Sequence, residues 1–374
     1  MMKILQIGKF YPIRGGVEKV MYDLTAGLSE AGIACDMLCA TTENHPGGVI
    51  QLNALGRIIA IRTQIKFAAT MIAPAMVLKL RRIASDYDII HIHHPDPMAC
   101  LALFLSGYKG KVVLHWHSDI LKQKTLLKLY RPLQDWLINR ADRIVGTTPV
   151  YVQQSDFLQG VQHKIDFIPI GVEPVKADPK RVTDIRSQYP DRKLVFSLGR
   201  LVEYKGYRYL LDAAKTLDPS YMVLIGGMGP QREELLHIIQ EHGLQNKVAL
   251  LGYIADDDVP NYFAACDVFC LSSTLKTEAF AIVQIEAMSC SKPVVSTHIP
   301  GSGVDWVNQH GESGVVVPKE DGSALAKAFE QVIEDPAYYQ KLANGASARF
   351  EAYFTRDRMV AAATQLYQKL EMEK

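Results

Sequence analysis

The sequence predicts an α/β protein made of two doubly wound domains, each built on a mainly parallel sheet. Short apolar runs alternate with amphipathic stretches along the chain, the pattern of parallel strands joined by crossover helices. At 374 residues the chain exceeds the usual size of one hydrophobic core. Residues 169–179 interrupt the alternation with three prolines and little periodicity, so we expect the boundary there.

Apolar runs and amphipathic stretches place the elements of the first half. The expected strands are residues 3–7, 34–40, 58–62, 88–93, 111–117, 142–146 and 164–168. The expected helices are residues 17–31, 71–83, 98–105, 121–139 and 149–158.

The same alternation restarts after the proline-rich segment. Strands are expected at residues 193–198, 221–225, 247–251, 268–271, 293–296 and 314–317. Helices are expected at residues 207–216, 231–242, 322–333, 338–353 and 356–372, with others between the later strands. Two such sheets should face each other across a cleft, with ligands beyond the C-terminal ends of the strands.

Composition excludes several classes of protein. Apolar residues make up 48% and charged residues 22%, so a disordered, collagen-like or disulfide-stapled chain is excluded. The formal net charge of +1 argues against wholesale nucleic-acid binding. Six cysteines without a C-x-x-C pair are expected to be buried thiols rather than metal ligands or disulfides. We find neither a signal peptide nor an apolar run that could span a bilayer, which predicts a cytoplasmic protein.

Charge is distributed unevenly. Residues 1–170 contain 19 Lys+Arg and 13 Asp+Glu, and residues 47–85 contain no acidic residue. Cations and apolar residues alternate in residues 47–85 and again in 121–131, which predicts a basic amphipathic surface drawn to anionic lipid. The alternative is that the apolar residues pack on the sheet and the cations are merely solvated.

Two glycine-containing loops follow predicted strands and precede predicted helices. Gly15 and Gly16 would let backbone N–H groups approach an anion, although a tight turn explains them equally well. Arg200 and Lys205, in the corresponding loop of the second half, suit a diphosphate, against the alternative of a solvated face. The spacing is neither G-x-G-x-x-G nor a P-loop.

Two carboxylates, Glu278 and Glu286, lie eight residues apart in an otherwise apolar segment. On one helix they would fall within ~80° of the same face. Buried carboxylates need partners, and a ligand with hydroxyl groups would satisfy both. Lys276 is the local alternative partner for Glu278. The helix N-terminus near residues 280–282 would offer N–H groups to a phosphate.

These motifs together resemble the retaining GT-B glycosyltransferases of family 4, and the resemblance covers the whole chain. The hallmark is Glu278-x7-Glu286 followed by Ala287-Met288. The other matching motifs, in order, are Gly15-Gly16-Val17-Glu18, His115-Trp116-His117-Ser118-Asp119, Pro169-Ile170-Gly171-Val172-Glu173, Gly199-Arg200-Leu201, Lys205-Gly206 and Gly226-Gly227-Met228-Gly229-Pro230. The resemblance implies an acceptor domain at residues 1–170, a nucleotide-sugar domain at 171–355 and a helix at 356–374 that packs toward the first domain.

The resemblance also implies roles in donor binding. Arg200 and Lys205 would hold the diphosphate, together with backbone groups at Gly15 and Gly16. Backbone N–H groups at Phe280, Ala281 and Ile282 would also face the phosphate. Glu286 would bind the ribose hydroxyls, and the backbone at Ile254 would receive the base.

Two residues are expected to act at the sugar itself. Glu278 would lie beside the reacting carbon, and His117, rather than His115, would contact the donor sugar. Ala279 and Ala281 replace frequent glycines, so we expect this turn to keep negative φ angles. A metal cluster of His91, His93, His94 and Asp96, and the D-x-D pairs at residues 86–88 and 256–258, are weighed and not favoured. No metal is therefore expected.

The predicted function is transfer of a hexose, with retention, from a nucleotide-diphosphate sugar to a glycan hydroxyl in O-antigen or other surface-polysaccharide synthesis. GDP-mannose is the first choice of donor, because residues 276–286 and 303–308 resemble bacterial mannosyl- and rhamnosyltransferases. A UDP-sugar is the second choice. A nucleotide-sugar epimerase of this fold and a catalytically idle sugar-nucleotide-binding subunit are the competing functions. The basic surface would imply a lipid-linked acceptor, reached at the inner face of the membrane.

Overall fold

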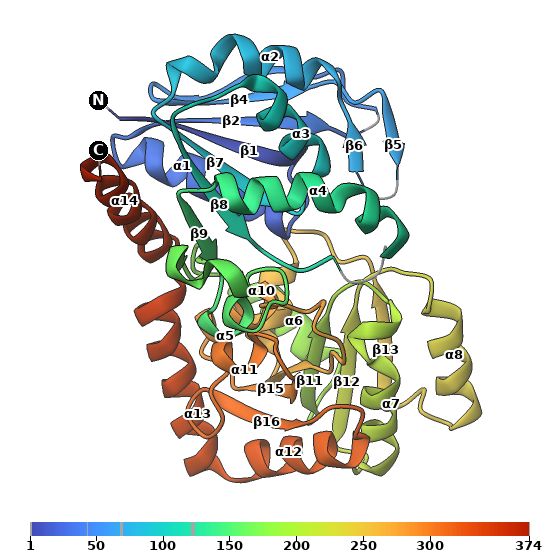
Figure 1. The fold of residues 1–374 in the computed structure, drawn as a ribbon. Helices are drawn as coiled ribbons and strands as arrows, with labels where there is room; N and C mark the ends of the chain where they lie inside the picture. Colours follow the sequence, from blue (N-terminus) through green and yellow to red (C-terminus); the bar gives the residue numbers. More distant parts are fainter. Residues whose placement is uncertain (1, 43, 68–69, 121–123, 374) are drawn as a thin grey trace. The chain divides into compact units, whose positions relative to one another are not determined.

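The computed structural model describes residues 2–42, 44–67, 70–120 and 124–373. The chain divides into two compact units, one formed by Met1–Val172 with Arg356–Lys374 and the other by Glu173–Thr355. Figure 1 shows the ribbon coloured along the sequence, with helices and strands labelled where there is room.

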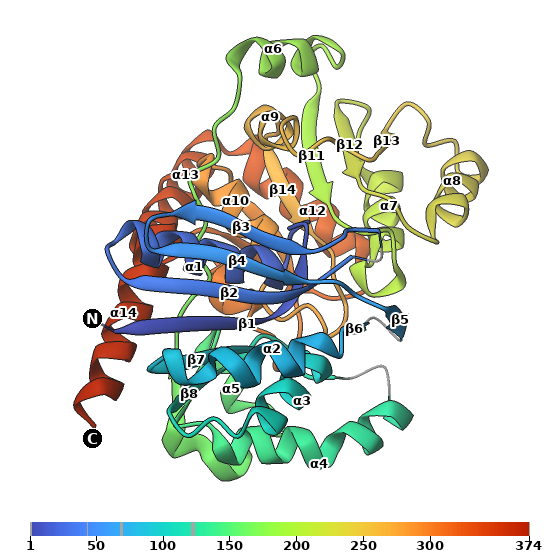
Figure 2. The same ribbon diagram turned by 90° about the horizontal axis from the view of Figure 1, so that it is seen from above.

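The first unit is built on an eight-stranded sheet with the order β10-β9-β8-β7-β1-β2-β4-β3. Its strands are β1 (Lys3–Tyr11), β2 (Ala34–Thr41), β3 (Gly48–Asn53), β4 (Gly56–Ile61), β7 (Ile89–His94), β8 (Lys111–Trp116), β9 (Arg143–Gly146) and β10 (Ile165–Phe167). All neighbours pair in parallel except β3, which runs antiparallel to β4 at one edge. Figure 2 shows β3, β4, β2 and β1 side by side in that order. All seven strands predicted here are present.

Helices connect these strands and bury their apolar faces. They are α1 (Val17–Glu30), α2 (Ala75–Ile83), α3 (Pro97–Ser106), α4 (Lys124–Arg140), α5 (Pro149–Gln153) and α14 (Arg356–Met372). The predicted helix 71–83 is wrong at its start, because residues 71–72 belong to β6 (Thr70–Ile72), paired with β5 (Ile65–Phe67). Pro74 disfavours helical geometry in the residue before it, so α2 begins only at Ala75. Residues 121–123, where a helix and basic stretch were expected to begin, lie outside the described residues.

The C-terminal helix α14, red in Figure 1, lies against α1 within the first unit. A Cβ atom at Gly27 of α1 would come within 2.4 Å of the Val360 side chain, so only glycine permits this approach. The Arg356 guanidinium binds Glu30 of α1 at 2.7 Å. The last helix is thus held by both packing and charge.

The second unit has a six-stranded, all-parallel sheet in the order β13-β12-β11-β14-β15-β16. The strands are β11 (Lys193–Leu198), β12 (Tyr221–Gly226), β13 (Val248–Gly252), β14 (Val268–Leu271), β15 (Val294–His298) and β16 (Gly314–Pro318). The helices are α6 (Pro179–Ser187), α7 (Tyr207–Thr216), α8 (Arg232–Glu241), α9 (Val259–Ala265), α10 (Ile282–Ser289), α11 (Val304–Val307), α12 (Gly322–Glu334) and α13 (Pro336–Arg349). A π-helical turn, Phe350–Phe354, follows α13, so the single helix predicted at 338–353 is wrong at its C-terminal end.

Burial follows the apolar pattern in both units. Strands β7, β12 and β14 are buried along their whole length, as expected for parallel strands covered on both faces. Five cysteines are buried, Cys290 is half-buried, and all six are free thiols. Among the described helices, none is both long and apolar enough to cross a bilayer.

Candidate active site

The predicted donor-binding residues of the second unit follow the C-terminal ends of its parallel strands. Arg200 and Lys205 come after β11, Ile254 after β13, and Glu278 after β14. Because parallel strands all end at one edge of the sheet, these four residues belong to the same edge.

The most specific contact at this edge is an ion pair between Lys205 and Glu278. The Lys205 Nζ lies 2.5 Å from Glu278 Oε2, and the two side chains are only 12% and 11% exposed. The Ser273 hydroxyl donates a second hydrogen bond to the same carboxylate oxygen, at 2.8 Å. A carboxylate and an ammonium group are therefore held together beside solvent, where a diphosphate and a sugar hydroxyl could each find a partner.

Glu278 reaches this position from a loop and not from a helix. Helix α10 begins at Ile282, so only Glu286 is helical, and the prediction that both carboxylates share one helix face is wrong. The ion-pair partner of Glu278 is Lys205, which is 73 residues away in the chain, rather than the local candidate Lys276.

Lys205 is positioned by a tight turn that only glycine can complete. A 3-10 turn, Glu203–Lys205, is followed by Gly206, whose φ angle of 66° lies in the left-handed region. A Cβ atom at Gly206 would lie 2.1 Å from the backbone oxygen of Ser272. The turn therefore packs directly on the loop after β14, and that packing brings Lys205 to Glu278.

The glycines after β12 serve the same close packing. A Cβ atom at Gly227 would lie 1.9 Å from the Gly199 oxygen, and one at Gly229 would lie 2.3 Å from the Leu201 oxygen. The loop that carries Arg200 is thus pressed against the loop after β12. Arg200 itself is exposed, and its Nη2 makes a long contact of 3.4 Å with the Tyr204 hydroxyl.

The turn before α10 is strained at one residue. Ala281 has φ 61° and ψ 81°, in the left-handed region, where a Cβ atom costs ~1–2 kcal/mol. The expectation that alanine forces a negative φ here is wrong, because the backbone keeps a geometry that glycine would adopt freely. Phe280 and Ala281 are buried, whereas Ile282 and Glu286 are half-buried at the start and middle of α10.

Ile254 is buried against the end of β12. A Cβ atom at Gly226 would meet the Ile254 side chain at 2.5 Å, so the isoleucine fills the space that this glycine leaves. Its side chain is therefore part of the core, and Ile254 could meet a ligand mainly through its backbone.

In the first unit, Gly15 and Gly16 form the entry to α1. Their φ angles are 128° and 64°, and Gly16 is the residue that precedes the first turn of the helix. Positive φ angles at both positions favour glycine. Because glycine has no side chain, nothing at positions 15 and 16 covers the free N–H groups at the start of α1.

Asp96 has a structural role in this unit. Its carboxylate accepts hydrogen bonds from the backbone N–H groups of Lys9, at 2.5 Å, and of Ala99, at 3.0 Å, where it caps α3. Burial raises the pKa of Asp96 and lowers the pKa of Lys9. His94 stacks on Trp116, and the set of His91, His93, His94 and Asp96, weighed above as a metal site and not favoured, is not among the groups whose ligand atoms lie close together in the described residues. The nitrogens of His91, His93 and His115 instead lie within 4.8 Å of one another.

His117 belongs to a buried stack of four histidines. Ring centroids are 5.1 Å apart for His93 and His117, and 4.0 Å apart for His115 and His117. Burial lowers the pKa of every member and brings that of His115 to about 3. All four imidazoles are therefore neutral near pH 7.

A one-way chain of hydrogen bonds fixes the protons of three of these four histidines, His91, His93 and His117. The contacts are His117 Nε2 to His93 Nδ1 at 2.9 Å, His93 Nε2 to Gln6 Oε1 at 2.8 Å, Gln6 Nε2 to Tyr367 Oη at 3.1 Å, and Tyr367 Oη to His91 Nδ1 at 2.5 Å. Because the Gln6 carbonyl can only accept, His93 carries its proton on Nε2, and its Nδ1 must accept from His117. His117 is thereby assigned the Nε2–H tautomer.

Sequence reasoning missed Ser273, Gln6, His93 and Tyr367 as partners of the candidate residues. Gln6 and Tyr367 are separated by 361 positions, and no periodicity or motif links them. The sequence pattern suggests His93 only as a possible metal ligand.

Comparison with known proteins assigns the class. Residues 14–176 match the family model "Glycosyltransferase Family 4", and residues 182–349 match "Glycosyl transferases group 1". Solved structures similar to the chain include Anabaena Alr3699/HepE in complex with UDP (TM-score 0.77, 22% identity, covering 98% of this chain and 100% of that one). Another is sucrose-phosphate synthase from Thermosynechococcus elongatus (TM-score 0.79, 23% identity, 100% of both chains). The fold is GT-B, as predicted.

Sequence relatives narrow the assignment. The chain is 34% identical to O-antigen chain mannosyltransferase C of Escherichia coli, over 99% of both chains. It is 32% identical to D-rhamnosyltransferase WbpZ of Pseudomonas aeruginosa, over 95% of this chain and 92% of the relative. The chain belongs to the family 4 glycosyltransferases, which confirms the predicted family and the glycosyltransferase class.

Proposed function

We propose that this glycosyltransferase moves a hexose, with retention of configuration, from a nucleotide-diphosphate sugar to a hydroxyl group of a growing surface glycan. The observation that carries the proposal is the Lys205–Glu278 ion pair at the C-terminal edge of the second sheet. It combines a cation suited to a diphosphate with a carboxylate suited to sugar hydroxyls. The O-antigen mannosyltransferase and the rhamnosyltransferase among the relatives support O-antigen or related polysaccharide synthesis.

In this mechanism the protein stabilises the leaving group. Negative charge grows on the diphosphate as the glycosidic bond breaks, and Arg200, Lys205 and the first N–H groups of α10 would stabilise that charge. Glu286 would accept hydrogen bonds from the ribose. The acceptor hydroxyl attacks from the same face and passes its proton to the departing phosphate, so no protein nucleophile is assigned.

His117 and Glu278 would position the donor sugar. Both histidines are buried, but His117 follows β8 at the end of the sheet where ligands bind, whereas His115 lies within the strand. A neutral His117 with its proton on Nε2 keeps Nδ1 as an acceptor, and this buried nitrogen has no hydrogen-bond partner among the described residues. That difference in placement favours His117 over His115.

GDP-mannose is the proposed donor, with a UDP-sugar as the second candidate. The Escherichia coli relative is a mannosyltransferase, which favours mannose as the sugar. The HepE structure contains UDP, which supports a UDP-sugar as the second candidate. The test is a panel of GDP- and UDP-sugars given to the purified protein, with nucleotide release measured in the presence and absence of a glycan acceptor. An idle binding subunit would bind a nucleotide sugar and release nothing, and an epimerase would change the sugar without needing an acceptor.

Retention and metal independence can be tested on the same reaction. The anomeric coupling constant of the product, read by NMR, should match the donor configuration; the opposite anomer would exclude retention. Activity should survive EDTA, because fixed cations and helix N–H groups carry the phosphate charge. Loss of activity that Mn²⁺ restores would overturn metal independence.

The acceptor is proposed to be lipid-linked and reached at the inner face of the membrane from the cytoplasm. Lys66, Arg81, Arg82 and Lys128 are exposed and have no carboxylate partner among the described residues. Because of this surface, the protein should sediment with anionic vesicles and not with neutral ones, and a smaller fraction should sediment at high salt. Equal recovery in the supernatant with both vesicle types would refute the membrane contact.

A further inference from the structure

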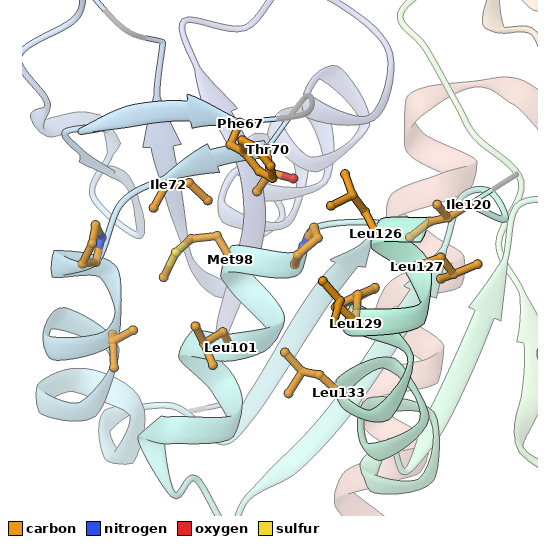
Figure 3. Close-up of a pocket in the computed structure, with 14 residues that line it drawn as sticks. Phe67, Thr70, Ile72, Met98, Leu101, Ile120, Leu126, Leu127, Leu129 and Leu133 are labelled. Atoms are coloured by element: carbon orange, nitrogen blue, oxygen red, sulfur yellow. The ribbon is translucent and has the colours of Figure 1, made fainter. Parts of the chain in front are cut away.

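An apolar groove lies in the first unit between the β5–β6 hairpin and the helices α2, α3 and α4. Its volume is about 450 Å³, within the usual range for small-molecule sites of ~300–1,000 Å³. Figure 3 shows side chains from the hairpin, α3 and α4 pointing toward a common space. Of its 14 lining residues, only Thr70 and Tyr130 carry a polar side-chain group.

The groove exposes large apolar side chains that a folded protein normally covers. Phe67 is 58% exposed, Leu101 38% and Leu129 80%, and they come from three separate elements. Single exposed apolar residues are common on protein surfaces, but a contiguous cluster of them usually marks a binding surface.

The helices and strands around the groove carry cations, and the carboxylates next to its lining, Asp96 beside Pro97 and Asp119 beside Ile120, are already hydrogen-bonded within the protein. β5, β6, α2 and α3 contain no Asp or Glu, and the first acidic residue of α4 is Asp135. Lys66 lies on β5, Arg81 and Arg82 on α2, and Lys128 on α4. A ligand that matches this surface has a hydrocarbon body and an anionic head.

The groove also reaches the catalytic edge of the first sheet. Its lining includes Pro97, just beyond the end of β7, and Ile120, three residues after His117 in the loop that follows β8. A chain lying in the groove would therefore bring its head group to the edge that carries His117.

We propose that this groove binds the hydrocarbon chain of a lipid-linked acceptor whose head group is a phosphate or diphosphate. The inference rests on the proposed transferase function and adds to it a location for the lipid. The apolar lining takes the chain, the surrounding cations attract the phosphate, and the open end directs the attached glycan to His117. A phosphate without a hydrocarbon chain would leave the apolar lining uncovered.

The test uses farnesyl diphosphate as the probe and inorganic diphosphate as the head-group control, with binding measured by calorimetry on the full chain. Leu101→Trp fills the groove while keeping its surface apolar. Leu105→Trp is the matched control, because Leu105 lies on the same helix and is 46% exposed but does not line the groove. Thermal melting shows whether each variant remains folded.

We expect the wild type to bind farnesyl diphosphate at least about tenfold more tightly than inorganic diphosphate. Leu101→Trp should weaken farnesyl diphosphate binding about tenfold, whereas Leu105→Trp should stay within about twofold of the wild type. Binding of GDP and UDP should be the same in all three proteins. With a lipid-linked acceptor, Leu101→Trp should raise the acceptor KM and leave donor hydrolysis unchanged.

Three results would overturn the proposal. Equal affinity of Leu101→Trp and wild type for farnesyl diphosphate would show that the probe binds elsewhere, and equal affinity for both diphosphates would show that the chain is not recognised. Concentration-dependent dimerisation that Leu101→Trp abolishes, without probe binding, would assign the groove to a second copy of this chain. Failure to bind any nucleotide sugar would instead refute the proposed function, independently of the probe.

Discussion

Replacing Glu278 with glutamine should tighten the binding of a free nucleoside diphosphate while slowing transfer. The substitution keeps the shape of the side chain and removes its charge, so the ammonium group of Lys205 loses its carboxylate partner. In the wild type a diphosphate must compete with that carboxylate, which lies 2.5 Å from Lys205 Nζ. A hydrogen bond to a charged group contributes ~1.5–3 kcal/mol, and both side chains are nearly buried, so screening by salt is weak.

The expected gain is therefore about 1.4 kcal/mol or more, which is about tenfold in Kd for GDP or UDP. Turnover should fall, because the role proposed for Glu278 in positioning the donor sugar depends on its charge. The unpaired Lys205 should also lower the free energy of unfolding by ~1–3 kcal/mol, since a partly buried charge loses its partner.

Calorimetry with GDP and UDP measures the gain, and Glu286→Gln is the matched control with the same chemical change. Glu286→Gln should weaken binding, because a ribose hydroxyl would lose a charged acceptor. Opposite signs for the two variants are the result expected, and the gain should vanish when Lys205→Met is added to Glu278→Gln. If Glu278→Gln weakened nucleotide binding as much as Glu286→Gln, the idea that the ion pair competes with the diphosphate would be refuted.

Three further outcomes follow from the structure. Arg200→Ala should lower kcat and leave the melting temperature unchanged, since Arg200 is exposed and its contact with Tyr204 is long; a destabilised variant would contradict this. Ala281→Gly should leave the free energy of unfolding unchanged or raise it by up to ~1 kcal/mol in urea titrations. Glycine removes the strain of the left-handed backbone in the folded state, and this gain should at least offset the greater conformational freedom that glycine gives the unfolded chain. Acid should destabilise the fold, because burial lowers the pKa of His94 and of His115 to about 3 in the folded state. In the unfolded chain each histidine has a pKa of ~6.5, so below that pH the unfolded chain binds protons that the folded protein does not. Lowering the pH from about 7 to about 5.5 should therefore reduce the free energy of unfolding by ~1.3 kcal/mol for each of these histidines. Urea titrations at both pH values check this, and His115→Phe should flatten the slope.

The fold was predictable where strands are buried on both faces. Such strands are continuous apolar runs, and the bounds of β11 and α7 were predicted without error. β3 was missed because none of its residues is buried, so it lacks an apolar run and depends on β4 for its hydrogen bonds. The β5–β6 hairpin was missed for a related reason, since each strand has three residues and none of them is buried.

The site was predictable as a set of residues but not as a set of contacts. Position between a strand and a helix selected Arg200 and Lys205, and the pair of carboxylates in an otherwise apolar segment selected Glu278. The pairing of Lys205 with Glu278 was not predictable, because it depends on how closely the loop at Gly206 approaches Ser272. The start of α10 at Ile282 lies within the predicted range of residues 280–282, but the left-handed conformation of Ala281 that precedes it was not predicted.

The hydrogen-bond chain in the first unit gives the C-terminal helix a role beyond packing. Tyr367 of α14 accepts from the Gln6 amide, and this contact orients the Gln6 carbonyl toward His93. That carbonyl fixes the proton of His93, which in turn assigns the tautomer of His117. Without Tyr367 the Gln6 amide nitrogen would keep only its long contact with Cys35 Sγ, at 3.9 Å, so the orientation that sets the proton pattern would be held more weakly. The last helix and the first strand together therefore determine which nitrogen of His117 carries the proton, although neither contributes a side chain to the predicted site.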